Sequence, residues 1–172
     1  MNKNSNIGFI GLGNMGKPIF DNLNKEFSNI FCFDKDTSKL KKNNFLSTLD
    51  EIFKKCKIII FCIESNDQIF DIIKENKIKK NTIIIDLTSS LPELSNKISF
   101  YLKKFESHYI DAGMSGGATG ASKGTLTLML GGSKTICKKI DCLLKTFSKN
   151  IFYLGKSGNG HMMKLLHNSV CH

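Results

Sequence analysis

Six residues near the start of the chain have the composition and spacing of a loop that binds phosphate groups. They are Gly11-Leu12-Gly13-Asn14-Met15-Gly16, which fit the pattern G-x-G-x-x-G. An apolar run precedes them and a helical pattern follows, which is the context that this pattern requires. In such a loop the first glycine allows a tight turn, the second lets the backbone approach a pyrophosphate, and the third lets the helix pack closely. We therefore predict a dinucleotide at the N-terminus of the first helix, with a plain strand-to-helix turn as the alternative.

An acidic residue follows the second apolar run, about 20 residues after the glycine loop. This residue is Asp34, and a carboxylate there can accept hydrogen bonds from the ribose hydroxyls of adenosine. It would also repel the 2′-phosphate of NADP, by about 4 kcal/mol at a separation of about 4 Å. The chain has no Arg to hold that phosphate, although Lys35 and Lys39 could take its place in part. The pattern favours NAD over NADP, and a solvated turn acid is the alternative.

Polar residues also follow other expected strands. In an open parallel sheet, ligands bind beyond the carboxyl ends of the strands. Thr88 and Ser89 follow one such run, and their hydroxyls could reach a ribose or cap the helix that begins near Pro92. Asn66 follows an earlier run, and we expect it to cap the next helix.

Small residues fill the segment Asp111-Ala112-Gly113-Met114-Ser115-Gly116-Gly117, after a short apolar run. We expect this segment to be a loop with room for a ligand. The Ser115 side chain and the amides of Gly116 and Gly117 could bind a carboxylate, as oriented N–H groups do in anion-binding nests. An ordinary flexible turn is the alternative.

The end of the chain predicts a helix with one polar stripe. A helical wheel places His161, Lys164, Asn168 and His172 within roughly 80° of one another. The other side holds Met162, Leu166 and Val170. The stripe presents a lysine and an asparagine one turn apart. Taken alone, it is typical of a solvated helix face.

Composition excludes several classes of protein. The formal net charge is +10, but all the basic residues are lysines that are scattered along the chain. This argues against nucleic acid as the main partner and favours a loose electrostatic attraction of anionic metabolites. The six cysteines form no C-x-x-C pair and no zinc-site spacing, so we expect no metal and a reducing, cytoplasmic location. No apolar run approaches the roughly 20 residues of a membrane-spanning helix, and we expect no secretory signal before the first strand.

Apolar runs alternate with amphipathic stretches along the chain. Several runs are nearly continuous in Ile, Phe and Leu, which is typical of strands covered on both faces. The alternation predicts an α/β fold with a Rossmann-like, doubly wound, mostly parallel sheet. We expect a dinucleotide-binding domain over residues 1–157 and the start of a long helix over residues 158–172. Expected strands are 7–10, 30–33, 58–62, 83–85, 109–110, 126–130 and 151–154, with a weaker one near 43–48; expected helices are 18–25, 47–55, 66–76, 92–105 and 133–147.

Four motifs, in this order, resemble the β-hydroxyacid dehydrogenases, which include 3-hydroxyisobutyrate dehydrogenase and 6-phosphogluconate dehydrogenase. The motifs are Gly8-Phe9-Ile10-Gly11-Leu12-Gly13-Asn14-Met15-Gly16, the segment that begins at Asp111, Gly124-Thr125-Leu126-Thr127-Leu128-Met129-Leu130-Gly131-Gly132, and Gly158-x-Gly160-x-x-x-Lys164-x-x-x-Asn168. The resemblance implies an NAD(P)-dependent oxidoreductase that moves hydride between a nicotinamide and a small anionic 3-hydroxy acid. A 6-phosphogluconate dehydrogenase-like enzyme and an inactive NAD-binding module or fragment are the alternatives.

The resemblance also implies roles for individual residues. Lys164 would exchange a proton with the reacting hydroxyl, and Asn168 would orient the substrate. A free lysine has a pKa near 10.4, so desolvation would have to lower the pKa of Lys164. Ser115, Gly116 and Gly117 would hold the substrate, and Thr88 and Ser89 would lie beside the cofactor.

The resemblance is incomplete at the end of the chain. The 6-phosphogluconate enzymes carry a glutamate where this chain has Cys171, so decarboxylation fits less well than a simple oxidation or reduction. Family members continue the last helix into a helical domain that completes the substrate pocket and forms the dimer. We therefore expect a homodimer or a separate helical C-terminal half as partner, and little turnover by this chain alone.

Overall fold

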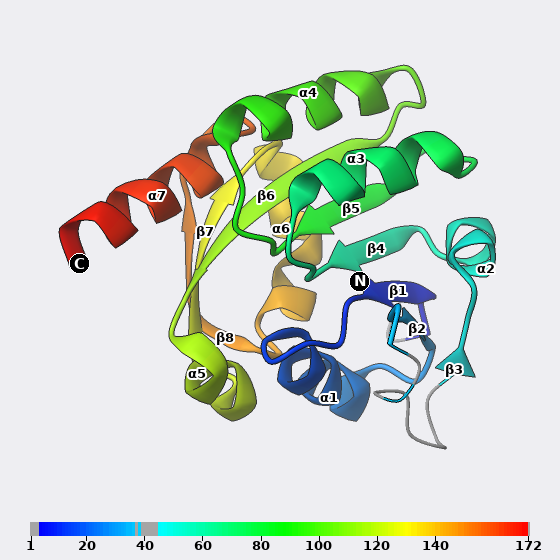
Figure 1. Cartoon of the computed structure of the whole chain (residues 1–172), viewed down its shortest axis with the longest axis horizontal. Helices are drawn as coiled ribbons and strands as arrows, with labels where there is room; N and C mark the ends of the chain where they lie inside the picture. Colours follow the sequence, from blue (N-terminus) through cyan, green and yellow to red (C-terminus); the bar gives the residue numbers. More distant parts are fainter. Residues whose placement is uncertain (1–3, 37, 39–44, 172) are drawn as a thin grey trace.

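The structure is a computed structural model that describes residues 4–36, 38 and 45–171 of the 172-residue chain. The described residues form the expected Rossmann-like α/β fold, with an eight-stranded sheet in the order β3-β2-β1-β4-β5-β6-β7-β8 (Figure 1). The strands are β1 Ile7–Ile10, β2 Ile30–Phe33, β3 Phe45–Leu46, β4 Ile58–Phe61, β5 Ile83–Asp86, β6 His108–Ser115, β7 Leu126–Gly131 and β8 Ser148–Tyr153. The helices are α1 Gly16–Glu26, α2 Leu49–Lys55, α3 Asn66–Glu75, α4 Pro92–Lys103, α5 Gly117–Lys123, α6 Lys134–Leu144 and α7 Asn159–Cys171.

The order of the strands reverses at β1. The chain proceeds outward from β1 to β2 and β3, and then returns to place β4 on the other side of β1. Ile10 at the end of β1 lies in register with Phe33 of β2 and Phe61 of β4, so these three parallel strands end at one level. Their carboxyl ends flank a topological switch point, which is where open α/β sheets bind ligands.

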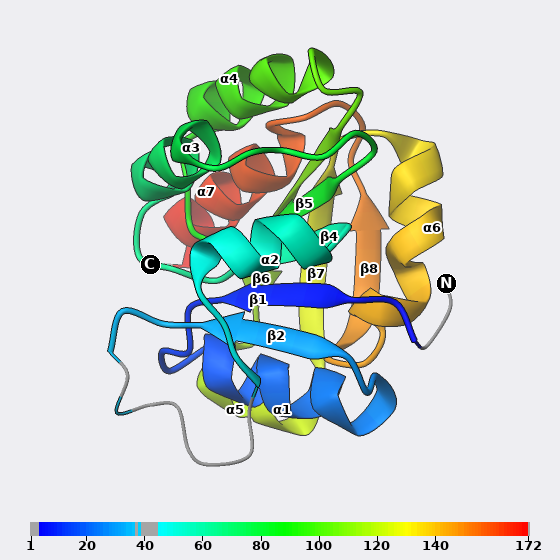
Figure 2. The ribbon, with the colours of Figure 1, turned by 90° about the vertical axis from the view of Figure 1, so that its right-hand side faces the viewer.

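The sheet is covered on both faces, as the apolar runs predict (Figure 2). Helices α1, α5 and α6 pack on one face around a core that includes Phe20, Leu128 and Leu143. Helices α2, α3 and α4 pack on the other face around a second core that includes Phe61 and Ile69. Helix α7 lies on this second side, against β6, β7 and α4. Among the described residues, no helix has both the length and the apolar character of a membrane span.

The expectation of a loop over residues 111–115 is wrong. These residues continue β6, because they pair with β7, which runs antiparallel to it. The pairing aligns Asp111 with Gly131 and Ser115 with Thr127. The glycines and the serine in this segment have low strand propensity, so the local sequence did not indicate that β6 continues here. The strand that pairs with it lies further along the chain, where a local pattern cannot report the pairing. The short helix α5 after Gly116 was also missed.

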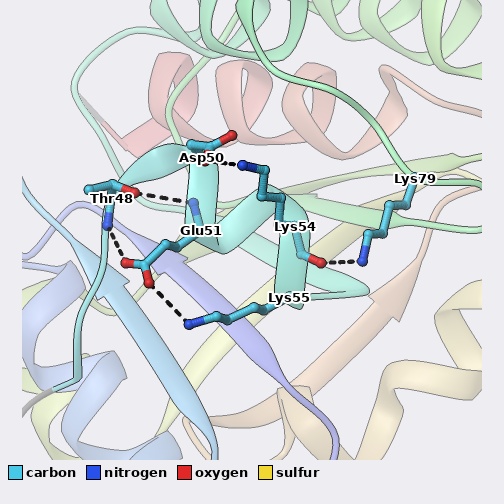
Figure 3. A network of polar contacts seen from close by, with 6 residues as sticks. All are labelled: Thr48, Asp50, Glu51, Lys54, Lys55 and Lys79. Atoms are coloured by element: carbon cyan, nitrogen blue, oxygen red, sulfur yellow. Dashed lines mark hydrogen bonds and ion pairs between the residues drawn. The ribbon is translucent and has the colours of Figure 1, made fainter.

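Two helix caps test the expectations from sequence. The expected Asn66 cap of α3 is wrong, because the Ser65 hydroxyl is the cap and accepts a hydrogen bond from the backbone N–H of Asp67. Helix α2 begins with a capping box formed by Thr48 and Glu51 (Figure 3). In this box the Glu51 N–H donates to the Thr48 hydroxyl at 3.2 Å, while the Thr48 N–H donates to the Glu51 carboxylate at 3.2 Å.

Ion pairs reinforce α2 along its exposed side. Lys54 pairs with Asp50 at 2.6 Å, and Lys55 pairs with Glu51 at 3.0 Å. The Lys79 ammonium donates to the last-turn carbonyl of Lys54 (Figure 3). Exposed pairs of this kind contribute little, so the capping box is the larger stabilising feature of this short helix.

Replacing Thr48 with Ala is expected to lower the free energy of unfolding by about 1 kcal/mol, because two backbone N–H groups lose their partners or the alignment with them. Urea denaturation measures this change. Thr135→Ala, at an exposed position of α6, is the matched control and should change stability by less than about 0.5 kcal/mol. Equal effects of the two substitutions would contradict the assignment of the cap.

Candidate functional site

A cleft of about 510 Å³ opens at the carboxyl ends of β1, β2, β4 and β5. Most of the residues proposed from sequence for the cofactor line this one cleft. These are Gly11, Gly13, Asn14, Met15, Gly16, Asp34, Thr88 and Ser89. Leu12 belongs to the same loop, but its side chain is buried in the core.

The three loop glycines have different environments. Gly11 has a φ of +99°, and a Cβ there would lie 2.3 Å from the carbonyl oxygen of Cys62. A Cβ on Gly16 would lie 1.9 Å from the carbonyl oxygen of Gly11. A Cβ on Gly13 would meet no atom within 4 Å. Gly11 and Gly16 are therefore required by the fold itself, whereas space at Gly13 is left open on the cleft side.

The N-terminus of α1 points a positive partial charge into this region. Its N-cap residue, Met15, makes no side-chain capping bond, and the first turn contains no acidic residue. The helix has 11 residues, so its aligned peptide dipoles can stabilise an anion near the first turn.

Asp34 ties the glycine loop to the end of β2. One carboxylate oxygen accepts the Leu12 N–H at 2.6 Å, and the other accepts the Asp36 N–H at 2.8 Å. The sequence indicated the position of Asp34 but not this bond to the loop. Lys35 also lines the cleft, whereas Lys39 lies outside the described residues.

Thr88 and Ser89 differ in burial and in their contacts. Thr88 is buried, its N–H donates to Asp86 at 2.7 Å, and its hydroxyl accepts the Ile63 N–H at 3.3 Å. Ser89 is exposed and lines the cleft. The alternative that these hydroxyls cap α4 is wrong, because the N-cap is Leu91 and no side chain caps it.

The β4–α3 connection contributes cleft residues that the sequence argument did not single out. Ile63 and Glu64 follow β4, while Gln68 and Ile72 reach the cleft from α3. The rule about carboxyl ends of strands could have found the first two, since β4 was correctly placed. Gln68 and Ile72 line the cleft because of the way α3 packs on the sheet, and no local sequence pattern predicts that packing.

The residues proposed for substrate and catalysis lie outside this cleft. Ser115 ends β6, and Gly116 and Gly117 begin α5 with φ values of +125° and +58°. Lys164 is half-buried on α7, and its Cβ would be 2.7 Å from a Cβ placed on Gly113. Asn168 lies one turn further along α7. Met114 lines the cleft from β6 and so links the two regions.

Asp111 fixes the start of α7. Its buried carboxylate accepts the N–H groups of Gly158 and Gly160 at 2.8 Å and of His161 at 3.1 Å. The Ser157 hydroxyl adds a fourth bond at 3.3 Å. A carboxylate of β6 therefore caps a helix about 50 residues away in sequence and sets where Lys164 lies. The sequence argument missed this role because it placed Asp111 in a loop.

The outer side of α7 is apolar and exposed. Leu166 is 53% exposed and Val170 is 86% exposed, and Met162 and Met163 are also exposed. His161 departs from the expected polar stripe, because it is 1% exposed and turned into the protein. Lys164 and Asn168, two members of the predicted stripe, are partly open to solvent, and the fourth member, His172, lies outside the described residues.

Comparisons with known proteins agree with this geometry. Residues 6–155 match the family model described as the NAD binding domain of 6-phosphogluconate dehydrogenase. The chain is 32% identical to 2-(hydroxymethyl)glutarate dehydrogenase of Eubacterium barkeri, over 98% of this chain and 59% of that protein. It is 31% identical to the mitochondrial 3-hydroxyisobutyrate dehydrogenase of Drosophila melanogaster, over 96% of this chain and 53% of that protein.

Solved structures share the fold. A Mycobacterium tuberculosis 3-hydroxyisobutyrate dehydrogenase structure with L-serine has a TM-score of 0.90 at 23% identity, over 98% of this chain and 60% of that chain. The chain thus spans little more than half the length of the relatives that it matches.

The different environments of Gly11 and Gly13 predict that the same substitution lowers stability at Gly11 and weakens dinucleotide binding at Gly13. Gly11→Ala should lower the free energy of unfolding by more than about 2 kcal/mol, because it combines backbone strain with a backbone clash. Gly13→Ala should change stability by less than about 1 kcal/mol but weaken dinucleotide binding at least about tenfold, since the methyl group occupies the open space. Chemical denaturation and calorimetric titration measure the two effects. Wild-type affinity in Gly13→Ala would contradict the proposed position of the pyrophosphate.

Proposed function

This chain belongs to the family of the NAD binding domain of 6-phosphogluconate dehydrogenase, and we propose that it is the cofactor-binding half of a 3-hydroxyacid dehydrogenase. The proposed reaction moves hydride between a nicotinamide cofactor and a small anionic 3-hydroxy acid. The observation that carries the proposal is the single cleft at the switch point, where the glycine loop, Asp34 and Ser89 come together. Similarity to hydroxy-acid dehydrogenases over nearly the whole chain supports the substrate class.

The residues of the cleft fit a dinucleotide. Gly13 leaves room for a pyrophosphate beside the N-terminus of α1, which favours negative charge. The Asp34 carboxylate, already bonded to the loop, retains acceptor capacity for ribose hydroxyls because each carboxylate oxygen can accept more than one hydrogen bond. Ser89 supplies an exposed hydroxyl on the opposite wall.

The catalytic step is assigned to α7. A bound nicotinamide would supply the hydride acceptor or donor. In the oxidation direction the neutral amine of Lys164 takes the proton of the substrate hydroxyl, and in reduction the ammonium returns it. Asn168, one turn away, hydrogen-bonds the substrate and orients it. Ser115 and the amides of Gly116 and Gly117 hold the substrate carboxylate.

The partly exposed position of Lys164 bears on its activity. Catalytic sites exclude bulk water, so the lysine needs cover to act on the substrate. The exposed apolar side of α7 is the surface that such cover would contact. We assign residues 1–157 to the dinucleotide-binding domain and 158–172 to the start of the catalytic helix. The proposed cover is a helical C-terminal half, in the same protein or a partner subunit.

Two further assignments belong to this proposal. We assign the protein to a reducing compartment, the cytoplasm in the first instance, because the cysteines that the structure describes form no disulfide bond and their spacing in the sequence fits no metal site. The mitochondrion is the alternative, since the fruit-fly relative is named as mitochondrial. A dinucleotide-binding module without catalysis is the second candidate function, and the exposed α7 favours it for the chain on its own.

Lys164→Met should abolish turnover of 3-hydroxy acids while leaving NAD affinity within about twofold of wild type. The assay compares the chain alone with the chain extended by the part of the Eubacterium barkeri relative that the match does not cover, and the extended form is expected to carry the activity. Lys149→Met, at an exposed lysine of β8, is the matched control. Persistent turnover in Lys164→Met would remove the lysine from the mechanism.

NAD should bind at least about tenfold more tightly than NADP, a difference of about 1.4 kcal/mol, because Asp34 opposes the 2′-phosphate. Calorimetric titration of both cofactors measures the ratio. Asp34→Asn should reduce the preference for NAD, because it removes the charge that repels the 2′-phosphate and so strengthens NADP binding. Lys35→Met should weaken the binding of NADP and leave that of NAD unchanged. Tighter binding of NADP by the wild-type chain would overturn the assignment.

A further inference from the structure

Asp86 is a buried carboxylate at the end of β5, across the cleft from Asp34. Its side chain is 0% exposed, whereas residues 87–89, which follow it directly, line the cleft. Burying a carboxylate costs free energy unless hydrogen bonds satisfy its oxygens. The partners of Asp86 therefore show what this side chain holds in place.

Two neutral donors satisfy the Asp86 carboxylate. One oxygen accepts the N–H of Thr88 at 2.7 Å, which closes a tight turn directly after β5. The other oxygen accepts the hydroxyl proton of Tyr109, a residue of β6 that is 3% exposed. Burial raises the pKa of Tyr109 well above its usual value, so the phenol keeps its proton and is the donor in this bond. Asp86 thus joins the turn at the cleft to a buried side chain of the next strand.

Thr88 extends this connection to a second part of the cleft wall. Its hydroxyl accepts the N–H of Ile63 at 3.3 Å, and Ile63 lies between β4 and α3. Thr88 and Ile63 both line the cleft, whereas Asp86 and Tyr109 are buried and do not belong to the residues that line it. The connections after β4 and β5 are therefore held together at Thr88, and the carboxylate behind it fixes them to β6.

This wall lies on the side of the cleft that the nicotinamide half of a dinucleotide would reach. In the proposed arrangement the adenosine ribose lies beside Asp34 at the end of β2, and the pyrophosphate lies at the N-terminus of α1. The strand order β2-β1-β4-β5 places β5 about 14 Å from β2, at about 4.8 Å per strand. The part of the cofactor beyond the pyrophosphate therefore extends toward Thr88 and Ser89.

We propose that Asp86 is a positioning residue that, together with Tyr109, holds Thr88 and Ser89 in place for the nicotinamide half of the cofactor. The inference rests on the proposed function, because it requires NAD in the cleft. It also explains why a carboxylate stands where an apolar side chain could complete the core. A carboxylate can accept a backbone N–H and a phenol hydroxyl at the same time, and an apolar side chain can accept neither.

Tyr109→Phe tests the proposal, because it removes the hydroxyl that donates to Asp86 and leaves the ring in the core. Calorimetric titration compares NAD with ADP, which carries the adenosine and both phosphates but lacks the nicotinamide half. The variant should weaken NAD binding at least about fivefold, as the loss of one buried hydrogen bond does, and keep ADP binding within about twofold of wild type. A merely structural role would leave both affinities unchanged or weaken both ligands alike.

Ser107→Ala is the matched control, because it removes a buried hydroxyl at the opposite ends of β5 and β6. That hydroxyl accepts the N–H of Thr82 at 3.1 Å and donates to the carbonyl of Lys79 at 3.0 Å. The control should lower the free energy of unfolding much as Tyr109→Phe does, and keep the affinities for NAD and ADP within about twofold of wild type.

Asp86→Asn is a second variant that keeps the test decisive if Tyr109→Phe does not fold. Its amide has one acceptor oxygen for two donors, so it should also weaken NAD binding selectively. Equal weakening of NAD and ADP, or wild-type affinity for NAD in a folded Tyr109→Phe or Asp86→Asn chain, would overturn the proposal and leave the proposed function standing. If the wild-type chain binds neither NAD nor ADP, the proposed function fails, and this inference fails with it.

Discussion

The close approach of Gly11 and Gly16 is the constraint on which the binding cleft depends. The carbonyl of Gly11 occupies the space that a Cβ of Gly16 would need, so the chain turns from β1 into α1 within a few residues. That turn places the N-terminus of α1 at the level where β1 and its neighbours end. The Asp34 carboxylate then holds the loop through the Leu12 N–H. A site for an anionic cofactor follows from packing before any ligand is considered.

Asp111 imposes the corresponding constraint on the second half of the proposed site. A carboxylate that is fully buried must be satisfied by hydrogen bonds, and the free N–H groups at the start of α7 provide them. The bond fixes α7 against Gly113, where no side chain intervenes, and so brings Lys164 close to β6. The antiparallel pairing of β6 with β7 makes this arrangement possible. The residues proposed for the cofactor and those proposed for catalysis are therefore positioned by two separate buried contacts.

Much of the fold could be predicted from local pattern. The Ile-rich β4 and β5 and the amphipathic α6 were evident because burial on both faces, or on one helix face, leaves a repeating signature. The glycine loop and Asp34 could be singled out because a dinucleotide requires glycines beside its pyrophosphate and an acid beside its ribose at that spacing, and both line the same cleft. The β6–β7 pairing, the roles of Asp111 and the burial of His161 were not found. Each depends on a contact between segments far apart in sequence, which composition and periodicity do not encode.

A crystal structure of the chain grown with saturating NAD tests the central claim most directly. The account predicts density for the pyrophosphate within hydrogen-bonding distance of the Gly13 region and the first turn of α1, with the adenosine ribose beside the Asp34 carboxylate. NAD bound elsewhere on the molecule, or a pyrophosphate turned away from α1, would contradict it.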